Sequence, residues 1–278
     1  MRKSNIIAYR NTAARREKAI MKELVAVEKQ EKRLEQSAVK PKPASWKDGL
    51  ESKIPPKVYS GLESAFCKGF MVVFSQGKAV IEKGFNKEEI KANYKIHDYA
   101  VQIKGGRKEL KLMRKGGDQS VFLNLVATTI EGIGLGALGI GMPDIVLFLG
   151  MLLKGIYEMA LNFGFDYETP PERMLILKMM ATALSSGDDW LQRNAEVERL
   201  LISETSEISE QMLENQMKET ASVFAMDMLL LKFIQGLPII GILGGAANPV
   251  YYNKVMKYVE LKYRKRYLQM QQKRGCDA

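Results

Sequence analysis

The residues that decide the fold are 131–163, EGIGLGALGIGMPDIVLFLGMLLKGIYEMALNF. The first part of this stretch carries closely spaced glycines, Gly132, Gly134, Gly136, Gly139 and Gly141. The second part is an apolar run that begins at Pro143, and proline suits the first turn of a helix, where a missing backbone N–H costs little. A sustained alternation of β-branched residues, which a sheet needs, occurs nowhere in the chain. We therefore predict an all-α fold.

A second apolar segment, residues 222–252, has a similar composition and also ends in small residues. Its glycines are Gly241, Gly244 and Gly245. Small residues let two helices approach closely. We predict that the two Gly-rich segments form apolar helices that pack against each other at the centre of the protein.

Helix signals also occur outside these two segments. Asn86 precedes two acidic residues, which is typical of a helix N-terminus. We predict helices over 12–36, from about Pro56 onward, from Asn86 to about Val101, and over 172–184. Residues 187–220 are rich in glutamate, and we interpret them as an acidic, solvated helical excursion.

The basic residues are concentrated at the two ends of the chain. The protein of 278 residues has a net charge of +10, with +7 in residues 1–42, +6 in residues 254–278 and −3 between them. We predict that residues 1–42 form a basic amphipathic helical arm, which Pro41 and Pro43 separate from a helical domain over 43–278. This asymmetry favours contact with a polyanion, either anionic lipid or nucleic acid, and the alternative is a pair of solvated helices. The candidate contact residues are Arg10, Arg15, Arg16, Lys262, Arg264, Lys265 and Arg266.

Three charged residues interrupt the apolar helix that follows Pro143. At about 100° per residue, Asp144, Lys154 and Glu158 fall within about 80° of one another around the helix. Charges on so apolar a helix must be paired, exposed or turned toward a polar cavity. The stripe is therefore a structural ion-pair network, a functional polar slot or a proton-transfer site. We favour the network, because the stripe carries both signs and can neutralise itself.

Glu131 stands alone in an apolar stretch, immediately before the first glycines. One interpretation is a buried carboxylate that faces a ligand or a basic partner such as Lys154 or Arg173. The other interpretation is a residue at a helix end near solvent, and we favour this second one.

The chain lacks the motifs that signal catalysis, cofactors or metals. The run Gly132-Ile133-Gly134-Leu135-Gly136 begins like a dinucleotide fingerprint, but the βαβ unit that this motif requires is missing. No Gly-x-Ser-x-Gly elbow and no Gly-Lys-Ser/Thr loop occurs. A single histidine, His97, excludes a multi-histidine metal centre. We expect no cofactor and no metal, and we favour a non-enzymatic role over a lipid or peptide hydrolase with an unrecognised site.

The apolar segments are poor candidates for membrane spans, because a spanning helix needs about 20 apolar residues. Residues 120–142 have the length, but Glu131 lies near their middle and glycines dilute the hydrophobicity. In the second segment, Asp227 and Lys232 leave only residues 233–247 uncharged. A buried hairpin or a reversible insertion into the membrane interface fits these patterns better, and the mean hydropathy of −0.18 argues against a polytopic membrane protein.

Two stretches of the chain, taken in order, are similar to a known family. The first is EGIGLGALGIGMPDIVLFLGMLLKGIYEMALNFGFD at 131–166, followed by Pro-Glu-Arg at 171–173, and the second is LPIIGILGGAANPVYYNKVMKYVELKYRKRYL at 237–268. This ordered pair resembles the EcsC family. The resemblance covers about 46–185 and 222–270, and the two motifs are fairly specific when they occur together.

The resemblance implies a role at a membrane rather than a reaction. The EcsC family takes its name from a gene linked to an ABC transporter operon that affects protein secretion in Gram-positive bacteria, and it implies no catalytic activity. Members usually carry arginine where this chain has Lys154. We expect a bacterial, peripheral, lipid-binding accessory protein at an anionic membrane surface, linked to a transporter complex or an envelope process. Nucleic acid is the less favoured partner, because no binding motif for it is visible.

The expected compartment is the cytoplasm, with association at the inner face of the membrane. The first residues, MRKSNIIAYRNTAARREK, lack the apolar stretch and cleavage site of a secretory signal. Cys67 and Cys276 lie far apart in sequence and form neither a disulfide framework nor a metal motif. The oligomeric state is left open.

Overall fold

The computed structural model describes residues 2–39, 54–75, 77–112, 142–202, 207–235 and 247–276. Within these ranges the chain is helical and contains no strand, which confirms the predicted all-α fold. The helices in chain order are α1 (Arg2–Val39), α3 (Pro56–Ser75), α4 (Lys78–Lys83), α5 (Lys87–Lys104), α6 (Arg107–Leu112), α8 (Met142–Asn162), α9 (Pro170–Leu184), α10 (Gly187–Ile202), α11 (Glu210–Gln235) and α12 (Ala247–Cys276).

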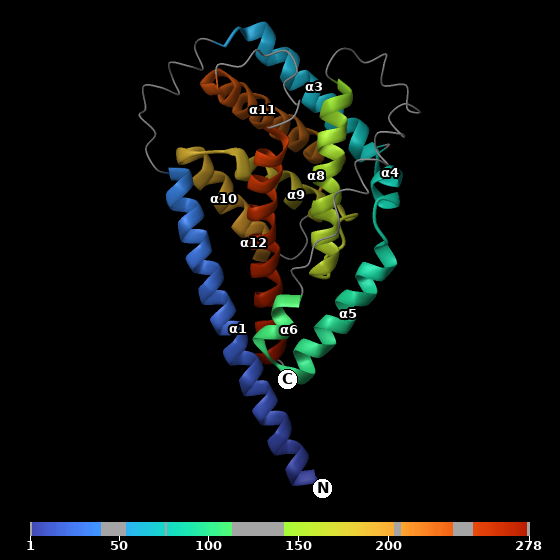
Figure 1. The fold of residues 1–278 in the computed structure, drawn as a ribbon, viewed down its shortest axis with the longest axis vertical. Helices are drawn as coiled ribbons and strands as arrows, with labels where there is room; N and C mark the ends of the chain where they lie inside the picture. Colours follow the sequence, from blue (N-terminus) through green and yellow to red (C-terminus); the bar gives the residue numbers. More distant parts are fainter. Residues whose placement is uncertain are drawn as a thin grey trace.

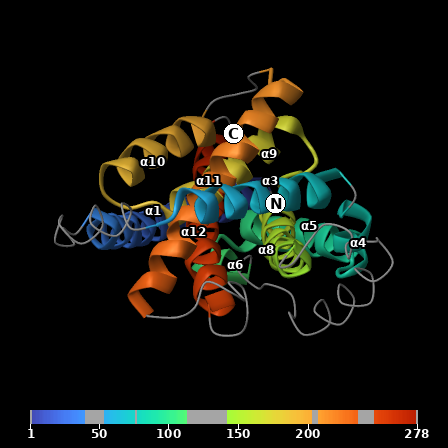
Figure 2. The same cartoon turned by 90° about the horizontal axis from the view of Figure 1, so that it is seen from above.

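Two views show how the helices are arranged (Figure 1, Figure 2). α8 and α12 contact each other in the middle of the protein, with α1 and α10 on one side and α4 and α5 on the other. α3 and α11 lie across one end, and α9 contacts α10, α11 and α12. α1 and α5 converge toward the opposite end, where α6 lies (Figure 1).

α8 lies inside the protein. Leu152 and Ile156 have no exposed surface. Within the described residues, Ile145–Asn162 is the one helical window with the length and hydropathy to cross a membrane, and 78% of this window is buried within the protein. At Gly155, α12 approaches so closely that a Cβ would lie 2.5 Å from the Tyr252 hydroxyl oxygen. α8 is therefore placed as a core helix.

Aromatic side chains join α3, α8 and α11. The ring centroid of Phe224 in α11 lies 5.5 Å from that of Phe66, 5.7 Å from that of Phe70 and 6.2 Å from that of Phe148. All four side chains are buried. Aromatic pairs of this kind add about 0.5–1.5 kcal/mol each beyond the burial of their area. The cluster thus holds α3 and α11 against α8.

Several helix ends lie where local signals predict them. Asn86 Oδ1 accepts a hydrogen bond from the Glu89 N–H at 3.1 Å, so Asn86 caps α5. α3 begins at Pro56. Gly105 caps the C-terminal end of α5, and its φ of 59° favours glycine. A Cβ at Gly105 would lie 2.8 Å from the Thr12 carbonyl oxygen, so this helix end also touches α1.

α1 packs into the same domain as the other helices. It lies along α12 and also contacts α5, α6 and α10. Ala19, Ile20 and Val27 are buried in the common core. The predicted boundary at Pro41 and Pro43 falls outside the described residues. The charges of α1 do not hold it away from the domain, because its carboxylates contact basic residues of α6 and α12.

The acidic residues 187–220 contribute a buried face as well. α10 packs against α9 and α1. Trp190, Val197 and Leu201 are buried, and their spacing places them on one face of the helix. The expectation of a solvated excursion is therefore corrected for α10, because one face of this helix packs into the core. In the sequence, this apolar face is hard to recognise among the many charged residues of α10.

Candidate functional site

The structure joins two members of the predicted polar stripe. Lys154 Nζ donates a hydrogen bond to Glu158 Oε1 at 2.8 Å, and the two side chains are only 4% and 6% exposed. Asp144 lies in the first turn of α8, and its side chain is outside the described part of the structure. A buried pair of opposite charges neutralises itself, whereas loss of one partner leaves the other charge unpaired. The geometry of Lys154 and Glu158 is that of an internal ion pair.

Several other predicted positions fall outside the described residues. They are Glu131 and the close-packing glycines Gly132, Gly134, Gly136, Gly139, Gly141, Gly241, Gly244 and Gly245. The packing of the two Gly-rich segments against each other stays a prediction.

Two lysines of α12 are neutralised by carboxylates from two other helices. Glu31 of α1 and Glu198 of α10 each contact both Lys262 and Lys265, which makes a closed ring of alternating charges. Glu31 oxygens lie 2.7 Å from Lys262 Nζ and 2.8 Å from Lys265 Nζ. Burial alone would raise the pKa of Glu198, but the two lysines outweigh burial and lower it. The ring ties α1, α10 and α12 together.

Arginine–carboxylate pairs continue along α12. Glu23 of α1 is 1% exposed, contacts Arg264 and accepts a hydrogen bond from Arg107 Nε of α6 at 2.6 Å. Burial by itself would raise the pKa of Glu23, but the hydrogen bonds from Arg107 and Arg264 hold it below its usual value. Arg266 Nη1 lies 2.7 Å from an oxygen of Glu172 in α9. Charge pairs therefore also fix α12 to α1 and α9.

The predicted polyanion contacts divide into two groups. The four basic residues on α12 from this set are paired with internal carboxylates, and two of them, Lys262 and Arg264, are 1% and 6% exposed. On α1, Arg15 is exposed and Arg16 is half-buried, whereas the side chain of Arg10 is outside the described part. The positive charge of the C-terminal helix is thus largely used within the fold.

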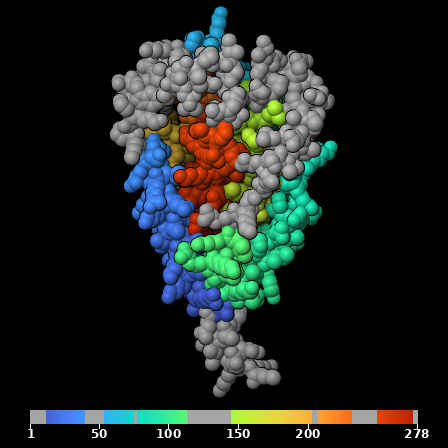
Figure 3. All heavy atoms as spheres, viewed as in Figure 1, coloured from blue at the N-terminus to red at the C-terminus, as the bar shows by residue number. Residues whose placement is uncertain are grey.

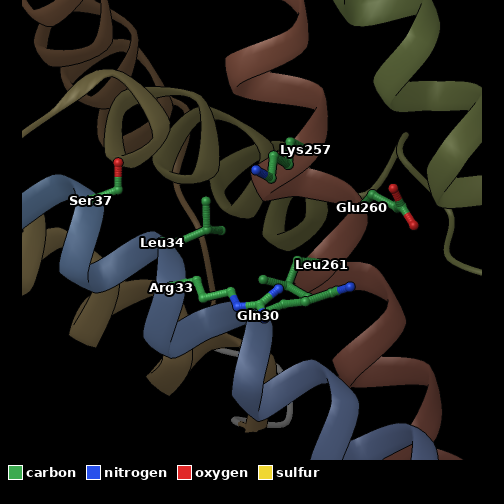
Figure 4. A pocket seen from close by; sticks show the side chains of 7 residues that line it. All are labelled: Gln30, Arg33, Leu34, Ser37, Lys257, Glu260 and Leu261. Carbon is green, nitrogen blue, oxygen red and sulfur yellow. The ribbon is translucent and has the colours of Figure 1, made fainter.

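Two adjoining cavities lie between α1 and α12. The first has a volume of about 360 Å³ and is lined by Gln30, Arg33, Leu34, Ser37, Lys257, Glu260 and Leu261 (Figure 4). The second has a volume of about 440 Å³ and extends toward α9 and α10. The apolar and aromatic residues that line the second cavity are Leu34, Ala38, Ala183, Trp190 and Tyr258. Because Leu34, Ser37 and Lys257 line both cavities, the two are neighbours.

The first cavity is cationic. Arg33 reaches from α1 toward α12, and Lys257 reaches from α12 toward α1 (Figure 4). Neither side chain has a carboxylate partner in the described part of the chain. Glu260, the one carboxylate in this lining, points away from α1 (Figure 4). Lys254, which lines the second cavity, has a carboxylate partner, because its Nζ lies 3.6 Å from Asp227 Oδ2.

α5 carries an exposed apolar stripe. Ile96, Tyr99 and Ile103 are 62%, 67% and 56% exposed. Their spacing of three and four residues places them on one side of the helix. Val101, which is fully buried, lies on the opposite side, toward the core. α5 forms the lower right edge of the molecule in the space-filling view (Figure 3).

Lysines flank this stripe. Lys95 and Lys104 are exposed on α5, and Lys108 and Lys111 are exposed on α6, which follows the C-terminal end of α5. None of these lysines pairs with a carboxylate within the described ranges. We call the group Lys95, Ile96, Tyr99, Ile103 and Lys104 the α5 face. The sequence-based site predictions did not include it.

Comparison with known proteins identifies the family. A model described as the EcsC protein family matches residues 18–268. This match begins within α1 and includes α10, so it extends beyond the two stretches that carry the motifs. No curated protein and no solved structure matches the chain. Because the family match spans nearly the whole sequence, the chain belongs to the EcsC protein family.

Proposed function

We propose that this protein is a peripheral membrane protein that binds anionic membrane surfaces through the α5 face, as an accessory to a membrane transporter or an envelope process. The observation that carries the proposal is the exposed stripe of Ile96, Tyr99 and Ile103 between lysines. A helix that lies in a membrane interface has this composition, with apolar side chains toward the acyl chains and lysines toward the headgroups. The accessory role follows from family membership by association alone.

The α5 face is strong enough for reversible binding. Full burial of one large apolar side chain is worth about 1.5–3 kcal/mol, so three that insert partly contribute on the order of 4 kcal/mol. A lysine near an anionic surface adds about 1 kcal/mol, which gives about 4 kcal/mol for the lysines of α5 and α6. The upper limit of about 8 kcal/mol corresponds to micromolar affinity. Binding of this strength is peripheral.

The lysines favour a membrane over a groove on another protein as the partner of the α5 face. A helix that docks in an apolar protein groove needs matched apolar contacts on its partner. An anionic bilayer supplies acyl chains for the isoleucines and negative headgroups for the lysines in one surface. Tyrosine, as at Tyr99, is also enriched where a protein meets the membrane–water interface.

Vesicle co-sedimentation of the full-length protein tests the proposal. Vesicles of phosphatidylcholine alone are compared with vesicles that also contain phosphatidylglycerol. We expect binding only to the anionic vesicles, and weaker binding at high salt. The triple variant Ile96→Ser, Tyr99→Ser, Ile103→Ser should bind on the order of 1,000-fold more weakly, because the apolar contribution of about 4 kcal/mol is lost.

A second triple variant controls for the loss of exposed apolar surface. Met71→Ser, Leu191→Ser, Met212→Ser removes side chains that are 45%, 39% and 46% exposed on other helices. This variant should bind anionic vesicles like the unmodified protein. Equal binding to both vesicle types, binding to neither, or the same loss in both triple variants would contradict the proposal.

A further inference from the structure

The first cavity between α1 and α12 holds positive charge that the fold itself does not neutralise. Further along α12, the basic residues between 262 and 266 each contact a carboxylate of another helix. Lys257 and Arg33 line the cavity with no such partner among the described residues. Like charges on facing walls of one cavity create a positive potential there, and this potential favours an anion.

Neutral hydrogen-bond donors line the same cavity. Gln30 Oε1 accepts a hydrogen bond from Arg264 Nη1 at 3.3 Å, which leaves the amide N–H groups of Gln30 able to donate. The Ser37 hydroxyl lies in the lining as well. A phosphate group can accept several hydrogen bonds at once, so it can use these neutral donors as well as the cations. Arginine binds a phosphate with two parallel N–H groups, and lysine binds it as a point charge.

The second cavity adds apolar side chains beside the cationic cavity, although its lining also includes Ser185, Ser186, Asn253 and Lys254. Trp190 is 5% exposed, and its ring meets that of Tyr258 edge-on with centroids 6.3 Å apart. Ala38 and Ala183 complete this part of the lining. The volume of each cavity lies within the range of about 300–1,000 Å³ that is typical of small-molecule sites. Together they can hold a charged group and an attached apolar group.

We propose that these adjoining cavities bind a phosphate monoester, with its phosphate between Arg33 and Lys257. The phosphate can belong to a lipid headgroup, whose apolar part would extend toward Trp190, or to a soluble phosphate ester. α5 contributes no residue to either lining, so this site does not depend on the proposed membrane contact. In the space-filling view, α12 reaches the protein surface beside α1 (Figure 3).

Isothermal titration calorimetry with three probes tests the site on the full chain. The probes are dioctanoyl phosphatidic acid below its micelle concentration, glycerol 3-phosphate, and dioctanoylglycerol, which lacks the phosphate. We expect phosphatidic acid to bind and dioctanoylglycerol not to bind. Binding of phosphatidic acid alone identifies a lipid source, and similar binding of glycerol 3-phosphate identifies a soluble one. In a Trp46→Phe background Trp190 is the only tryptophan, and its emission should change when an apolar group enters the second cavity.

Variants locate the bound probe. Arg33→Gln with Lys257→Gln should weaken binding on the order of 100-fold, because two charge-assisted contacts are lost. Arg33→Lys with Lys257→Arg keeps both charges and should retain most of the affinity. Lys32→Gln removes an exposed charge next to Arg33 and should bind normally, as should the triple serine variant of the α5 face. No binding of either phosphate probe, equal binding of dioctanoylglycerol, or unchanged affinity in the double glutamine variant would overturn the proposal.

Discussion

Replacement of Glu23 by glutamine would leave two arginines facing a neutral amide where α1, α6 and α12 meet. The Arg264 side chain is 7% exposed, so it would become a buried, unpaired charge, which costs about 3–5 kcal/mol. The Arg107 side chain is 48% exposed, so its contact with Glu23 contributes about 1 kcal/mol or less. We expect Glu23→Gln to lower the free energy of unfolding by about 4 kcal/mol, from a typical total of about 5–15 kcal/mol.

Urea denaturation followed by circular dichroism measures this effect. Glu28→Gln removes the same charge from an exposed position of α1, and it should change the free energy of unfolding by about 0.5 kcal/mol at most. Glu23→Leu combined with Arg264→Met removes both buried charges and should recover most of the lost stability. If Glu23→Gln and Glu28→Gln unfold at the same urea concentration, the charge contact does not stabilise the domain and the reasoning is refuted.

Three further changes test other parts of the structure. Lys154→Ala should lower the free energy of unfolding by about 3–5 kcal/mol, because Glu158 would stay buried without its partner, whereas Lys154→Met with Glu158→Leu should be nearly neutral. An unchanged urea midpoint for Lys154→Ala would show that this ion pair does not matter. The pKa of Glu168 is lowered from 4.5 to about 2, mainly by the hydrogen bond from Lys87, so its contribution is complete above pH 4.5 and is lost as the pH falls toward 2. That shift corresponds to about 3 kcal/mol, which screening reduces to about 1 kcal/mol because the side chain is 33% exposed. Stability of Glu168→Gln should therefore fall less between pH 4.5 and 2 than that of the unmodified protein, and identical acid denaturation curves would contradict this. Deletion of residues 1–42 should abolish the cooperative thermal transition, because it removes the buried face of α1; a retained cooperative transition would show that α1 is a separable arm.

Helix positions could be predicted because their signals act locally. Asn86 caps α5, and Pro56 is the first residue of α3. The apolar run after Pro143 also predicts a helix, and its low charge suits the core position that α8 occupies. None of these features depends on residues far away in the sequence.

Pairings between distant helices could not be predicted from the sequence. Glu23 and Arg264 are 241 positions apart, and nothing in their local surroundings indicates that they meet. The charge of +6 in residues 254–278 fits a polyanion contact as well as it fits internal pairing. Only the tertiary contacts show that carboxylates of α1, α9 and α10 neutralise four of these eight basic residues.

The α5 face was missed for a different reason. Its spacing is visible in the sequence, since Ile96, Tyr99 and Ile103 recur every three to four residues. α5 has apolar residues on a second side too, and Val101 lies there. Periodicity alone does not predict which of two apolar sides of a helix faces the core. The tertiary structure is needed to identify the exposed side of α5.

Quenching by brominated lipids tests the membrane contact of the α5 face most directly. In a Trp46→Phe background, Tyr99→Trp places an indole within that face, and Leu191→Trp places one at a 39% exposed position on α10 as the control. Buried Trp190 is common to both variants. With vesicles that contain phosphatidylglycerol and brominated acyl chains, we expect strong quenching of Tyr99→Trp and little quenching of Leu191→Trp. Equal quenching of the two variants, or none for Tyr99→Trp, would contradict the proposal that α5 inserts into the membrane interface.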